Sequence, residues 1–258
     1  MFEFYKYHGA GNDFIMIDNR DKVFDINDTD NIKLLCHRHV GIGADGIILL
    51  ENHPDHNFEM VYMNSDGSIG AMCGNGGRCI VHFAERVLGI IGDPNNIRFK
   101  SVDGEHEASI GGNEVKLKMQ DVDLVLTHND LPFLYSGTTP HVIKFVNDIE
   151  NYPVVEEGRQ IRYSHPDGVN ANFVEAKDGV FYARTYERGV EDETLACGTG
   201  ATSIAIAAHT LQMFEGNTCT VKMPGGDLTI EFEVTEDGEY KNIWLSGPAV
   251  CVFKGKME

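Results

Sequence analysis

The sequence predicts an α+β fold of two similar halves, each a strongly curved sheet wrapped around one central helix. Two cysteines lie 124 positions apart (197 − 73), about half of the 258-residue chain, and both begin the same pattern. Each follows strand-like sequence, opens a Gly-x-Gly turn and precedes an apolar helix. The two stretches are Cys73-Gly74-Asn75-Gly76, leading into Ile80–Ala84, and Cys197-Gly198-Thr199-Gly200, leading into Ile204–Ala208.

The remaining elements follow from periodicity and turn residues. Helical patterns cover residues 29–39, 73–88 and 198–213, and most other apolar segments are β-branched or alternate as strands do. Clear strand candidates are 14–17, 58–62 and 115–119. Hairpin turns are predicted at Gly111-Gly112-Asn113, at Asp178-Gly179 between strands 172–176 and 180–184, and at Gly225-Gly226.

Composition excludes several classes of function. The chain is 42% hydrophobic and 24% charged, as in ordinary globular proteins, and its net charge of −19 opposes binding to a phosphate backbone. The longest apolar runs, such as Ile47–Leu50, are too short to cross a bilayer. Met1–Lys6 lacks the basic and apolar regions of a signal peptide. We therefore expect a cytoplasmic protein that binds neither nucleic acid nor membranes.

The six cysteines are expected to be thiols, because a chain of this size without a secretory signal seldom uses disulfides. Outside the two repeated turns, we expect the other four to act as small core hydrophobes. These four are Cys36, Cys79, Cys219 and Cys251.

The two remaining cysteines stand where a thiol becomes reactive. The positive end of a helix dipole lowers the pKa of a thiol at the helix start from about 8.5 toward neutrality. Unbonded N–H groups of the first turn, exposed by glycine, suit a carboxylate ligand. With two such helix starts in one cleft, a thiolate would remove an α-proton and a thiol would return one from the opposite face. The alternative is two inert cysteines that cap buried helices.

Other motifs favour no competing chemistry. Gly41-Ile42-Gly43-Ala44-Asp45-Gly46 matches G-x-G-x-x-G, but helix-like sequence precedes it and strand-like sequence follows, the reverse of a dinucleotide site. Cys36-His37-Arg38-His39 lacks the spacing of known metal motifs, so no metal is expected. A cysteine protease would use one reactive thiol and leave the second unexplained.

The whole chain resembles the diaminopimelate epimerase family, and the matching motifs keep their order. They include His8–Phe14, Gly41–Gly46, Asn64–Ser68, Cys73–Cys79, Pro140-His141, Asn170–Phe173, Tyr186–Gly189 and Ala196–Gly200. The resemblance implies cofactor-independent epimerisation of L,L-diaminopimelate to meso-diaminopimelate, in lysine and peptidoglycan-precursor biosynthesis. It also implies an active-site cleft between the two halves. We place one half at residues 1–118 with 247–258 and the other at residues 119–246.

The family's residue roles carry over position by position. Cys73 and Cys197 would be the two acid–base thiols, assisted by His141 and Glu187. Residues that would bind the substrate's reacting carboxylate are Gly74, Asn75, Gly198 and Thr199. Residues that would bind its distal amino-acid end are Asn12, Asn64, Asn170, Glu187 and Arg188. Arg188 suits the distal carboxylate and Glu187 the distal ammonium. The otherwise default interpretation of Glu187 and Arg188 is an exposed ion pair.

This chain departs from the family's pattern at two positions. Thr139 precedes Pro140-His141 where many members carry asparagine, and Gly46 stands where some carry glutamine. An additional acidic residue occurs in Gly189–Thr194. These differences concern recognition of the distal end of the substrate.

Two rival functions remain open at the level of sequence. One is a related racemase or isomerase acting on another carbon acid, such as proline or hydroxyproline, which lacks a distal zwitterion. The other is a redox or ligand-binding protein whose thiols form a reversible disulfide. The resemblance also implies a homodimer whose ligand is a small amino acid.

Overall fold

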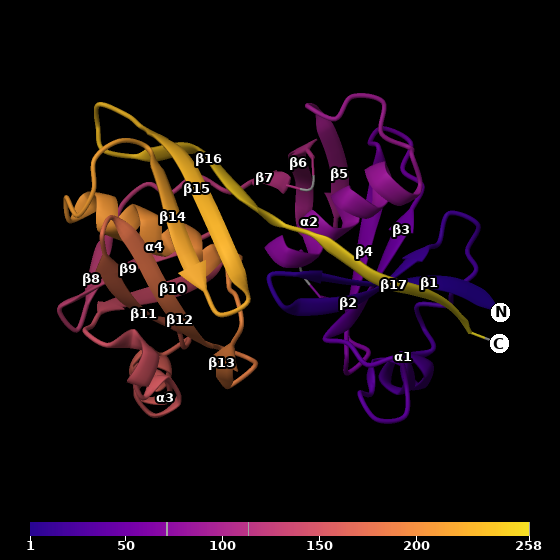
Figure 1. The fold of residues 1–258 in the computed structure, drawn as a ribbon, viewed down its shortest axis with the longest axis horizontal. Coiled ribbons are helices and arrows are strands. Elements are labelled where there is room, and N and C mark those ends of the chain that lie inside the picture. The colour runs from indigo at the N-terminus through magenta and orange to yellow at the C-terminus, as the bar shows by residue number, and fades with distance from the viewer. Residues whose placement is uncertain (71, 113, 258) are drawn as a thin grey trace. The chain divides into compact units, whose positions relative to one another are not determined.

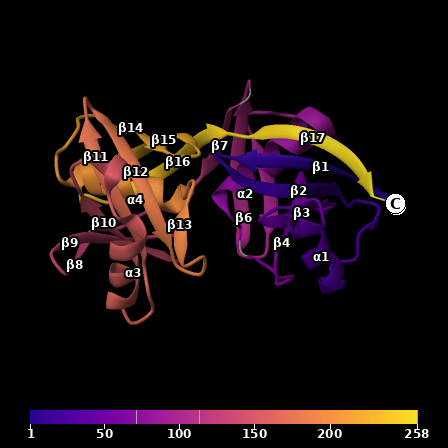
Figure 2. The same cartoon turned by 60° about the horizontal axis from the view of Figure 1, so that its bottom comes forward.

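The computed structural model describes residues 1–70, 72–112 and 114–257, and the chain forms two compact units. Unit 1 consists of Met1–Leu117 with Pro248–Glu258, and unit 2 of Lys118–Gly247. Figures 1 and 2 show that each unit is a curved sheet with a helix inside it. This arrangement confirms the predicted fold class, α+β with two similar halves.

The sheet of unit 1 has the strand order β17-β1-β2-β3-β4-β5-β6-β7. The β2/β3 and β4/β5 pairs are parallel, and the β17/β1, β1/β2, β3/β4, β5/β6 and β6/β7 pairs are antiparallel. The strands are β1 (Phe2–Gly9), β2 (Asn12–Asp18), β3 (Gly46–Glu51), β4 (Phe58–Asn64), β5 (Ile97–Ser101), β6 (Gly104–Gly111), β7 (Glu114–Lys118) and β17 (Val250–Met257).

The central helix of unit 1 is α2 (Gly74–His82), which continues as a π-helical turn, η1 (Phe83–Val87). It packs against β1, β2, β3 and β6, so the sheet curves around it. Helix α1 (Thr29–Cys36) starts at Asp28, whose carboxylate accepts the Asn31 N–H, and it joins β2 to β3. Its apolar residues pack in a second core with the other face of β2 and β3.

The sheet of unit 2 has the strand order β8-β9-β10-β11-β12-β14-β15-β16, and β13 also pairs with β12. The β10/β11 and β12/β14 pairs are parallel and the others are antiparallel. The strands are β8 (Leu126–His128), β9 (Leu131–Ser136), β10 (Thr139–Phe145), β11 (Asn170–Lys177), β12 (Val180–Glu187), β13 (Asp192–Thr194), β14 (Thr218–Met223), β15 (Gly226–Val234) and β16 (Tyr240–Pro248).

The central helix of unit 2 is α4 (Gly198–Thr210), which contacts β9, β10, β11, β14 and β15. It is buried around nearly its whole circumference, as its small and aliphatic residues allow. On the other face, α3 (Val154–Ser164) follows a short 3₁₀ turn, η2 (Ile149–Asn151), and packs on β11 and β12.

The two units repeat the same topology. Strands β17 and β1–β7 correspond in order and direction to β8–β12 and β14–β16. Helix α1 corresponds to α3, and α2 corresponds to α4. Asn12 and Thr139 begin the equivalent strands β2 and β10, and Gly46 and Asn170 begin the equivalent strands β3 and β11. The cysteine turns therefore occupy equivalent places, before the central helix.

The predicted hairpins agree with the strand pairing. Lys177 pairs with Val180 around Asp178-Gly179, and Met223 pairs with Gly226 around the Gly225-Gly226 turn. Strands β6 and β7 also pair antiparallel, although Asn113 of their predicted turn lies outside the described residues. The predicted strands at 14–17, 58–62 and 115–119 correspond to β2, β4 and β7.

The predicted helix ends need two corrections. Helix α1 stops at Cys36 instead of residue 39, because His37 is extended and the N–H groups of Gly43 and Ala44 bond the carbonyls of Leu35 and Cys36. Helix α4 stops at Thr210 instead of 213. There Gln212 is left-handed (φ 57°) and the Met213 N–H closes on the Ala208 carbonyl.

Two other predictions were wrong or incomplete. Helix α3 was missed because its sequence is mostly polar and has a glycine at its centre, Gly158. A Cβ at Gly158 would lie 2.4 Å from the Tyr186 Cβ, so glycine permits close packing on β12. Cys251 is exposed instead of part of the core, because most of β17 is exposed, whereas Cys36, Cys79 and Cys219 are buried thiols as expected.

Candidate active site

Cys73 and Cys197 occupy the same position relative to their helices. Each is the N-cap of its central helix with extended backbone angles, φ −98° and ψ 129° for Cys73 and φ −125° and ψ 111° for Cys197. The Cys73 carbonyl accepts the Gly77 N–H at 2.7 Å, and the Cys197 carbonyl accepts the Ala201 N–H at 2.9 Å. Each cysteine therefore stands at the N-terminus of its central helix, and the Cys197 sulfur accepts the Gly200 N–H at 3.4 Å.

In unit 1, the amide of Asn12 lies beside the Cys73 thiol. The Cys73 Sγ is 3.5 Å from the Asn12 Oδ1, which also accepts from the Asn75 Nδ2 at 3.3 Å. The Asn12 Nδ2 donates to the Asp45 carboxylate at 2.6 Å. The family resemblance implies that Asn12 binds the distal end of a substrate, whereas the structure places its Oδ1 at 3.5 Å from the Cys73 sulfur.

Charged groups at the two ends of a chain of hydrogen bonds fix the orientation of the Asn12 and Asn75 amides. Arg78 can only donate, and it donates to the Asn75 Oδ1 at 2.8 Å. The Asn75 Nδ2 must then face Asn12. The Asp45 carboxylate, which also pairs with Arg38, accepts from the Asn12 Nδ2. The chain Arg78–Asn75–Asn12–Asp45 leaves the Asn12 oxygen facing the sulfur.

A cluster of opposite charges supports Asp45 and Asp13. Arg38 bonds both Asp13 oxygens, at 2.7 and 3.0 Å, and the Asp45 Oδ1 at 2.7 Å, while Lys6 bonds Asp13 and the Gly43 carbonyl. Burial alone would raise the pKa of Asp13, but the Arg38 and Lys6 hydrogen bonds outweigh it and hold the pKa at about 2. Asp13 therefore stays ionised at neutral pH.

In unit 2, the Cys197 sulfur lies among hydrogen-bond donors. The Gly200 N–H donates to it at 3.4 Å, and the Asn170 Nδ2 lies 3.9 Å away. The Asn170 Oδ1 accepts the Arg188 N–H at 2.8 Å, which turns the Asn170 NH₂ group toward the sulfur. The Thr199 Oγ1 is 3.5 Å from the same sulfur.

His141 joins the Cys197 site through Thr199. Its Nε2 lies 3.0 Å from the Thr199 Oγ1, and its Nδ1 lies 3.1 Å from the Asn172 Nδ2. Because the Asn172 amide donates to Nδ1, the imidazole carries its proton on Nε2. Burial lowers the pKa of His141 to about 3, so the ring is neutral at physiological pH.

Asn172 is a member of this site that sequence reasoning missed. Its Nδ2 also bonds the Val142 carbonyl at 3.0 Å, and its Oδ1 accepts the Thr185 hydroxyl at 3.0 Å. Alternation along β11 was an available signal, because Asn172 lies two residues after Asn170 and hence on the same face of the strand.

Comparison with known proteins decides the family. The family model described as "Diaminopimelate epimerase" matches residues 4–125 and 133–252. The chain belongs to the diaminopimelate epimerase family.

Curated relatives carrying that family name cover the chain almost completely. A diaminopimelate epimerase of Flavobacterium psychrophilum is 48% identical, covering 97% of this chain and 98% of the relative. One of Aquifex aeolicus is 38% identical, with 99% and 97% covered.

More distant solved structures share only the fold. A Bacillus anthracis phenazine biosynthesis protein of the PhzF family has a TM-score of 0.74 at 16% identity, covering 100% of this chain and 99% of that one. A probable proline racemase from Agrobacterium radiobacter K84 has a TM-score of 0.71 at 16% identity, covering 100% and 93%.

The other residues matched to diaminopimelate epimerase positions lie at strand ends. Asn64 ends β4, and its Nδ2 donates to the Ser68 Oγ at 3.0 Å. Glu187 ends β12 at the equivalent place in unit 2 and accepts the Thr194 hydroxyl. The exposed Arg188 follows it, and its guanidinium bonds the Asp167 carbonyl at 3.2 Å.

The two positions at which this chain departs from the family's pattern, Gly46 and Thr139, lie at the starts of β3 and β10. Gly46 begins β3, where a Cβ would lie 2.4 Å from the Met63 carbonyl oxygen and 2.5 Å from the Tyr62 ring. A larger residue at Gly46 would require both the Met63 backbone and the Tyr62 ring to move. The expected reversal of the G-x-G-x-x-G motif is observed, because α1 precedes it and β3 follows.

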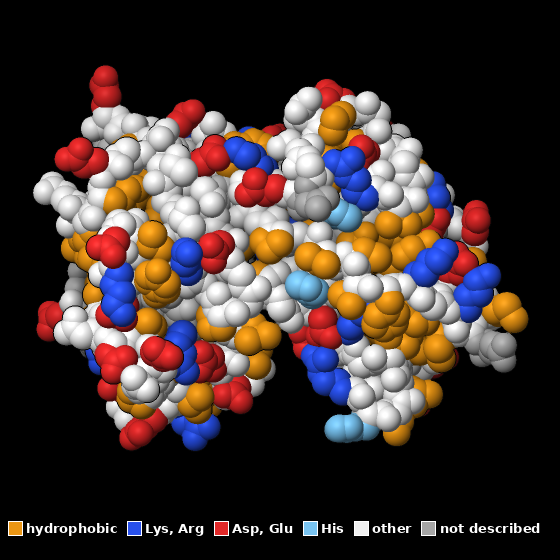
Figure 3. Space-filling model, in the orientation of Figure 1, with side chains coloured by type: hydrophobic (Ala, Val, Ile, Leu, Met, Phe, Trp, Pro, Cys, Tyr) orange, Lys and Arg blue, Asp and Glu red, His pale blue; other side chains and the backbone are white. Residues whose placement is uncertain are grey.

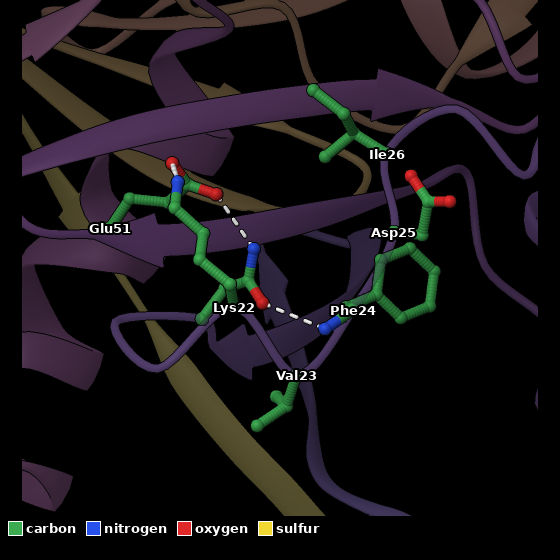
Figure 4. Close-up of a pocket in the computed structure, with 7 residues that line it drawn as sticks. Lys22, Val23, Phe24, Asp25, Ile26 and Glu51 are labelled. Carbon is green, nitrogen blue, oxygen red and sulfur yellow. Dashed lines mark hydrogen bonds and ion pairs between the residues drawn. The ribbon is translucent and has the colours of Figure 1, made fainter.

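One cavity of about 380 Å³ in unit 1 is lined by none of these residues. Its lining includes the loop from Lys22 to Ile26, and Lys22 forms an ion pair with Glu51 (Figure 4). The Asn19 amide bridges Glu51 and the Phe24 N–H, so the polar groups hold this loop in place.

Two features are absent from residues 1–70, 72–112 and 114–257. Among them, no helix combines the length and the apolar character needed to cross a bilayer. In the same residues, no group of three or more His, Cys, Asp or Glu side chains is arranged to hold a metal ion.

Proposed function

We propose that this protein interconverts L,L-diaminopimelate and meso-diaminopimelate, in lysine and peptidoglycan-precursor biosynthesis. The observation that carries the proposal is the equivalent placement of two N-cap cysteines in two halves of one repeated topology. A duplicated thiol suits a reaction that needs one base and one acid. Family membership makes the chain an isomerase of the epimerase type.

The proposed reaction uses only groups of the protein. First-turn backbone N–H groups of Gly74, Asn75, Gly198 and Thr199 bind the reacting carboxylate. One thiolate takes the Cα proton, and the electron pair of the broken C–H bond passes into the carboxylate as an enediolate. The opposite thiol then donates its proton to Cα, so one thiol and one thiolate remain and no cofactor is consumed. The bound N–H groups stabilise the enediolate.

This mechanism requires both thiols to reach one carbon from opposite faces. We therefore propose that residues 1–118 with 247–258 and residues 119–246 act as two functional halves that close over the substrate. Exclusion of water on closure would strengthen the interaction of the helix starts with the developing negative charge.

We further propose that Asn64, Glu187 and Arg188 bind the distal amino-acid end, together with Asn12 and Asn170. Arg188 would bind the distal carboxylate and Glu187 the distal ammonium. The exposed position of Arg188 leaves its guanidinium accessible to a ligand. A proline-type substrate has no such end, so these residues separate the proposed substrate from that alternative.

His141 and Glu187 are proposed to assist the thiols. A neutral imidazole that bonds the Thr199 hydroxyl can hold that hydroxyl beside the Cys197 sulfur. His141 would thus be a positioning residue. Glu187, at the end of β12, would contact the substrate.

We propose that the protein forms a homodimer and that it is located in the cytoplasm. Support for association comes from the edge strand β17, on which Val250, Val252 and Phe253 are 40%, 55% and 48% exposed. Hydrophobic side chains gather over β1 and β17 in Figure 3. An exposed apolar edge strand is a common pairing surface. A Phe253→Lys substitution should produce monomers in analytical ultracentrifugation.

The decisive experiment is isotope exchange. Reduced protein is incubated with L,L-diaminopimelate in D₂O, without metal or cofactor, and followed by NMR and mass spectrometry. We expect meso product with solvent deuterium at the inverted carbon, and no product from Cys73→Ala or Cys197→Ala. Folded wild-type protein that gives no exchange would refute this substrate. Exchange into proline or hydroxyproline instead would identify the rival activity.

A further inference from the structure

The hydroxyl of Tyr62, on β4, is available to a ligand. Within the described residues, no group forms a hydrogen bond with its oxygen. That oxygen is also reached by solvent, since the buried side-chain oxygens that lack a partner in the same residues belong to Ser101, Ser136 and Ser246. The Tyr62 side chain as a whole is half-buried. It therefore presents a free polar group on an otherwise packed ring.

Two glycines make room for the Tyr62 ring. A Cβ at Gly46 would lie 2.5 Å from the ring Cε2 and 3.2 Å from the hydroxyl oxygen. A Cβ at Gly70 would lie 2.5 Å from Cδ1, on the opposite edge of the ring. The Phe14 ring meets Tyr62 edge-on, with 5.8 Å between the centroids. The ring is therefore held from three sides, and its hydroxyl is held with it.

Tyr62 lies close to two parts of the candidate site. It stands two residues before Asn64 on β4, so both side chains lie on the same face of the sheet. The Cβ position of Gly70 is 3.2 Å from the Asn64 Oδ1 and 2.5 Å from the Tyr62 ring, which makes the amide and the ring neighbours. Among charged or ionisable groups, Cys73 acts most strongly on Tyr62, followed by Asp45.

The Tyr62 hydroxyl is a hydrogen-bond donor at neutral pH. Burial raises the pKa of Tyr62 above its ordinary value of 10.0, and the neighbouring Cys73 and Asp45 raise it further. The phenol therefore keeps its proton. A hydroxyl that donates to a carboxylate forms a shorter and stronger bond than one that donates to a neutral acceptor.

Asn64 offers the opposite polarity beside it. The Asn64 Nδ2 donates to the Ser68 Oγ at 3.0 Å, and that hydroxyl in turn donates to the Asp66 carboxylate at 2.6 Å. The Asn64 Oδ1, on the side of Gly70 and Tyr62, is therefore the acceptor of the pair. A donor and an acceptor side by side match the carboxylate and the ammonium that one amino-acid carbon carries.

We propose that Tyr62 is a substrate-binding residue whose hydroxyl donates a hydrogen bond to the distal carboxylate, while the adjacent Asn64 oxygen accepts from the distal ammonium. This inference rests on the proposed function and adds a specificity determinant to it. Unit 1 would supply its own donor and acceptor to the end that Glu187 and Arg188 are proposed to bind. A proline-type substrate has no distal carboxylate and would leave the hydroxyl unused.

The alternative is a purely structural role, in which the ring covers the Gly46 backbone as aromatic residues cover strand glycines. Tyr62→Phe separates the two roles, because it keeps the ring and removes only the oxygen. We expect the KM for L,L-diaminopimelate to rise about tenfold, as for a lost hydrogen bond to a charged group, with kcat within about twofold of wild type. Urea denaturation should show unchanged stability, since a structural role resides in the ring.

Tyr5→Phe is the matched control. Tyr5 is also a half-buried tyrosine of unit 1, and its ring packs on Phe83 with 5.2 Å between the centroids. Its hydroxyl likewise has no hydrogen bond within the described part of the chain. Tyr5→Phe should leave KM and kcat unchanged. An unchanged KM in Tyr62→Phe, or an equal rise in both variants, would overturn the proposal.

Two analogues identify the group that the hydroxyl binds. L-2-aminopimelate keeps the distal carboxylate and lacks the distal ammonium, whereas L-lysine keeps the ammonium and lacks the carboxylate. In isothermal titration calorimetry, Tyr62→Phe should weaken binding of L-2-aminopimelate about tenfold and leave binding of L-lysine unchanged. Asn64→Ala should affect L-lysine more. Equal weakening of both analogues by Tyr62→Phe would refute the assignment to the carboxylate.

The binding titrations do not depend on turnover, so they separate this inference from the proposed function. Active enzyme whose Tyr62→Phe variant keeps the wild-type KM and affinity would refute the inference and leave the function standing. Wild-type protein that binds L,L-diaminopimelate more tightly than Tyr62→Phe, yet gives no deuterium exchange, would refute the function and leave the binding role of Tyr62.

Discussion

The imidazole Nε2 of His141 lies 3.0 Å from the Thr199 hydroxyl, and that hydroxyl lies 3.5 Å from the Cys197 sulfur. One side chain of the first helical turn therefore connects a fully buried histidine with a thiol. The Thr199 side chain therefore has contacts of its own, besides the backbone N–H that we propose binds the reacting carboxylate.

We expect Thr199→Val to lower kcat about tenfold or more with a smaller change in KM, because the backbone N–H of residue 199 remains. The substitution also leaves the buried His141 Nε2–H without its partner, which costs about 1–3 kcal/mol of stability. Steady-state kinetics and urea denaturation measure the two effects. Thr202→Val is the control, since its hydroxyl donates to the Gly198 carbonyl at 3.1 Å, within the same helix. Equal kcat losses in both variants would contradict a role for the Thr199 hydroxyl.

Because burial lowers the pKa of His141, we expect the stability of the protein to depend on pH. This pKa falls from the ordinary 6.5 to about 3 on burial, so the unfolded chain binds the extra proton between these values. The contribution of neutral His141 is complete above pH 6.5 and is lost as the pH falls toward 3. Thermal unfolding followed by circular dichroism should show a steeper loss from pH 6.5 to 4 in wild type than in His141→Gln. Parallel curves would contradict this titration.

Gly200→Ala should displace Cys197. A Cβ at position 200 would lie 2.6 Å from the Asn172 Oδ1, 3.2 Å from the Cys197 Cβ and 3.3 Å from its sulfur. We expect activity to fall about a hundredfold, because small errors in thiol position are costly in proton transfer. The control is Gly92→Ala, where a Cβ meets nothing within 4 Å. Full activity of Gly200→Ala would show that the site tolerates this movement.

Asp13 should contribute to stability at neutral pH and lose that contribution in acid. Its pKa lies at about 2 instead of 3.8, so the ionised form stabilises the fold above pH 3.8, and protonation removes this effect as the pH falls through 2. We expect Asp13→Asn to cost about 1–3 kcal/mol at pH 7, since Lys6 and Arg38 lose a charged acceptor, and less at pH 3. Urea denaturation measures both values. Asp21→Asn, at an exposed position, should change stability by less than about 0.5 kcal/mol.

The repeat of the cysteine turns was enough to predict the fold class, because helix starts and alternating strands are local patterns. Helix α3 was missed because its sequence is polar and it is held by packing on β12. It could still have been found: a helix at 29–39 implies, in a repeated topology, a helix at the equivalent place in the second half.

The orientation of the Asn12 and Asn75 amides could not have been predicted. The orientation of Asn12 depends on Asp45 and Arg78, which are distant in sequence and meet it only through the pairing of β2 with β3 and the packing of α2. The neutrality of His141 likewise depends on complete burial. Motifs predict which residues belong to the candidate site. The protonation state of a residue such as His141 depends on its neighbours in the folded protein.

Strand β17 (Val250–Met257) pairs with β1 along its whole length, although all of unit 2 separates them in the sequence. During synthesis, the uninterrupted unit 2 can therefore acquire its full set of strands before unit 1 does. Until β17 arrives, the outer edge of β1 presents unpaired N–H and C=O groups. A ribosome paused between the two units would expose that edge, and chaperones or a second nascent chain could bind it first.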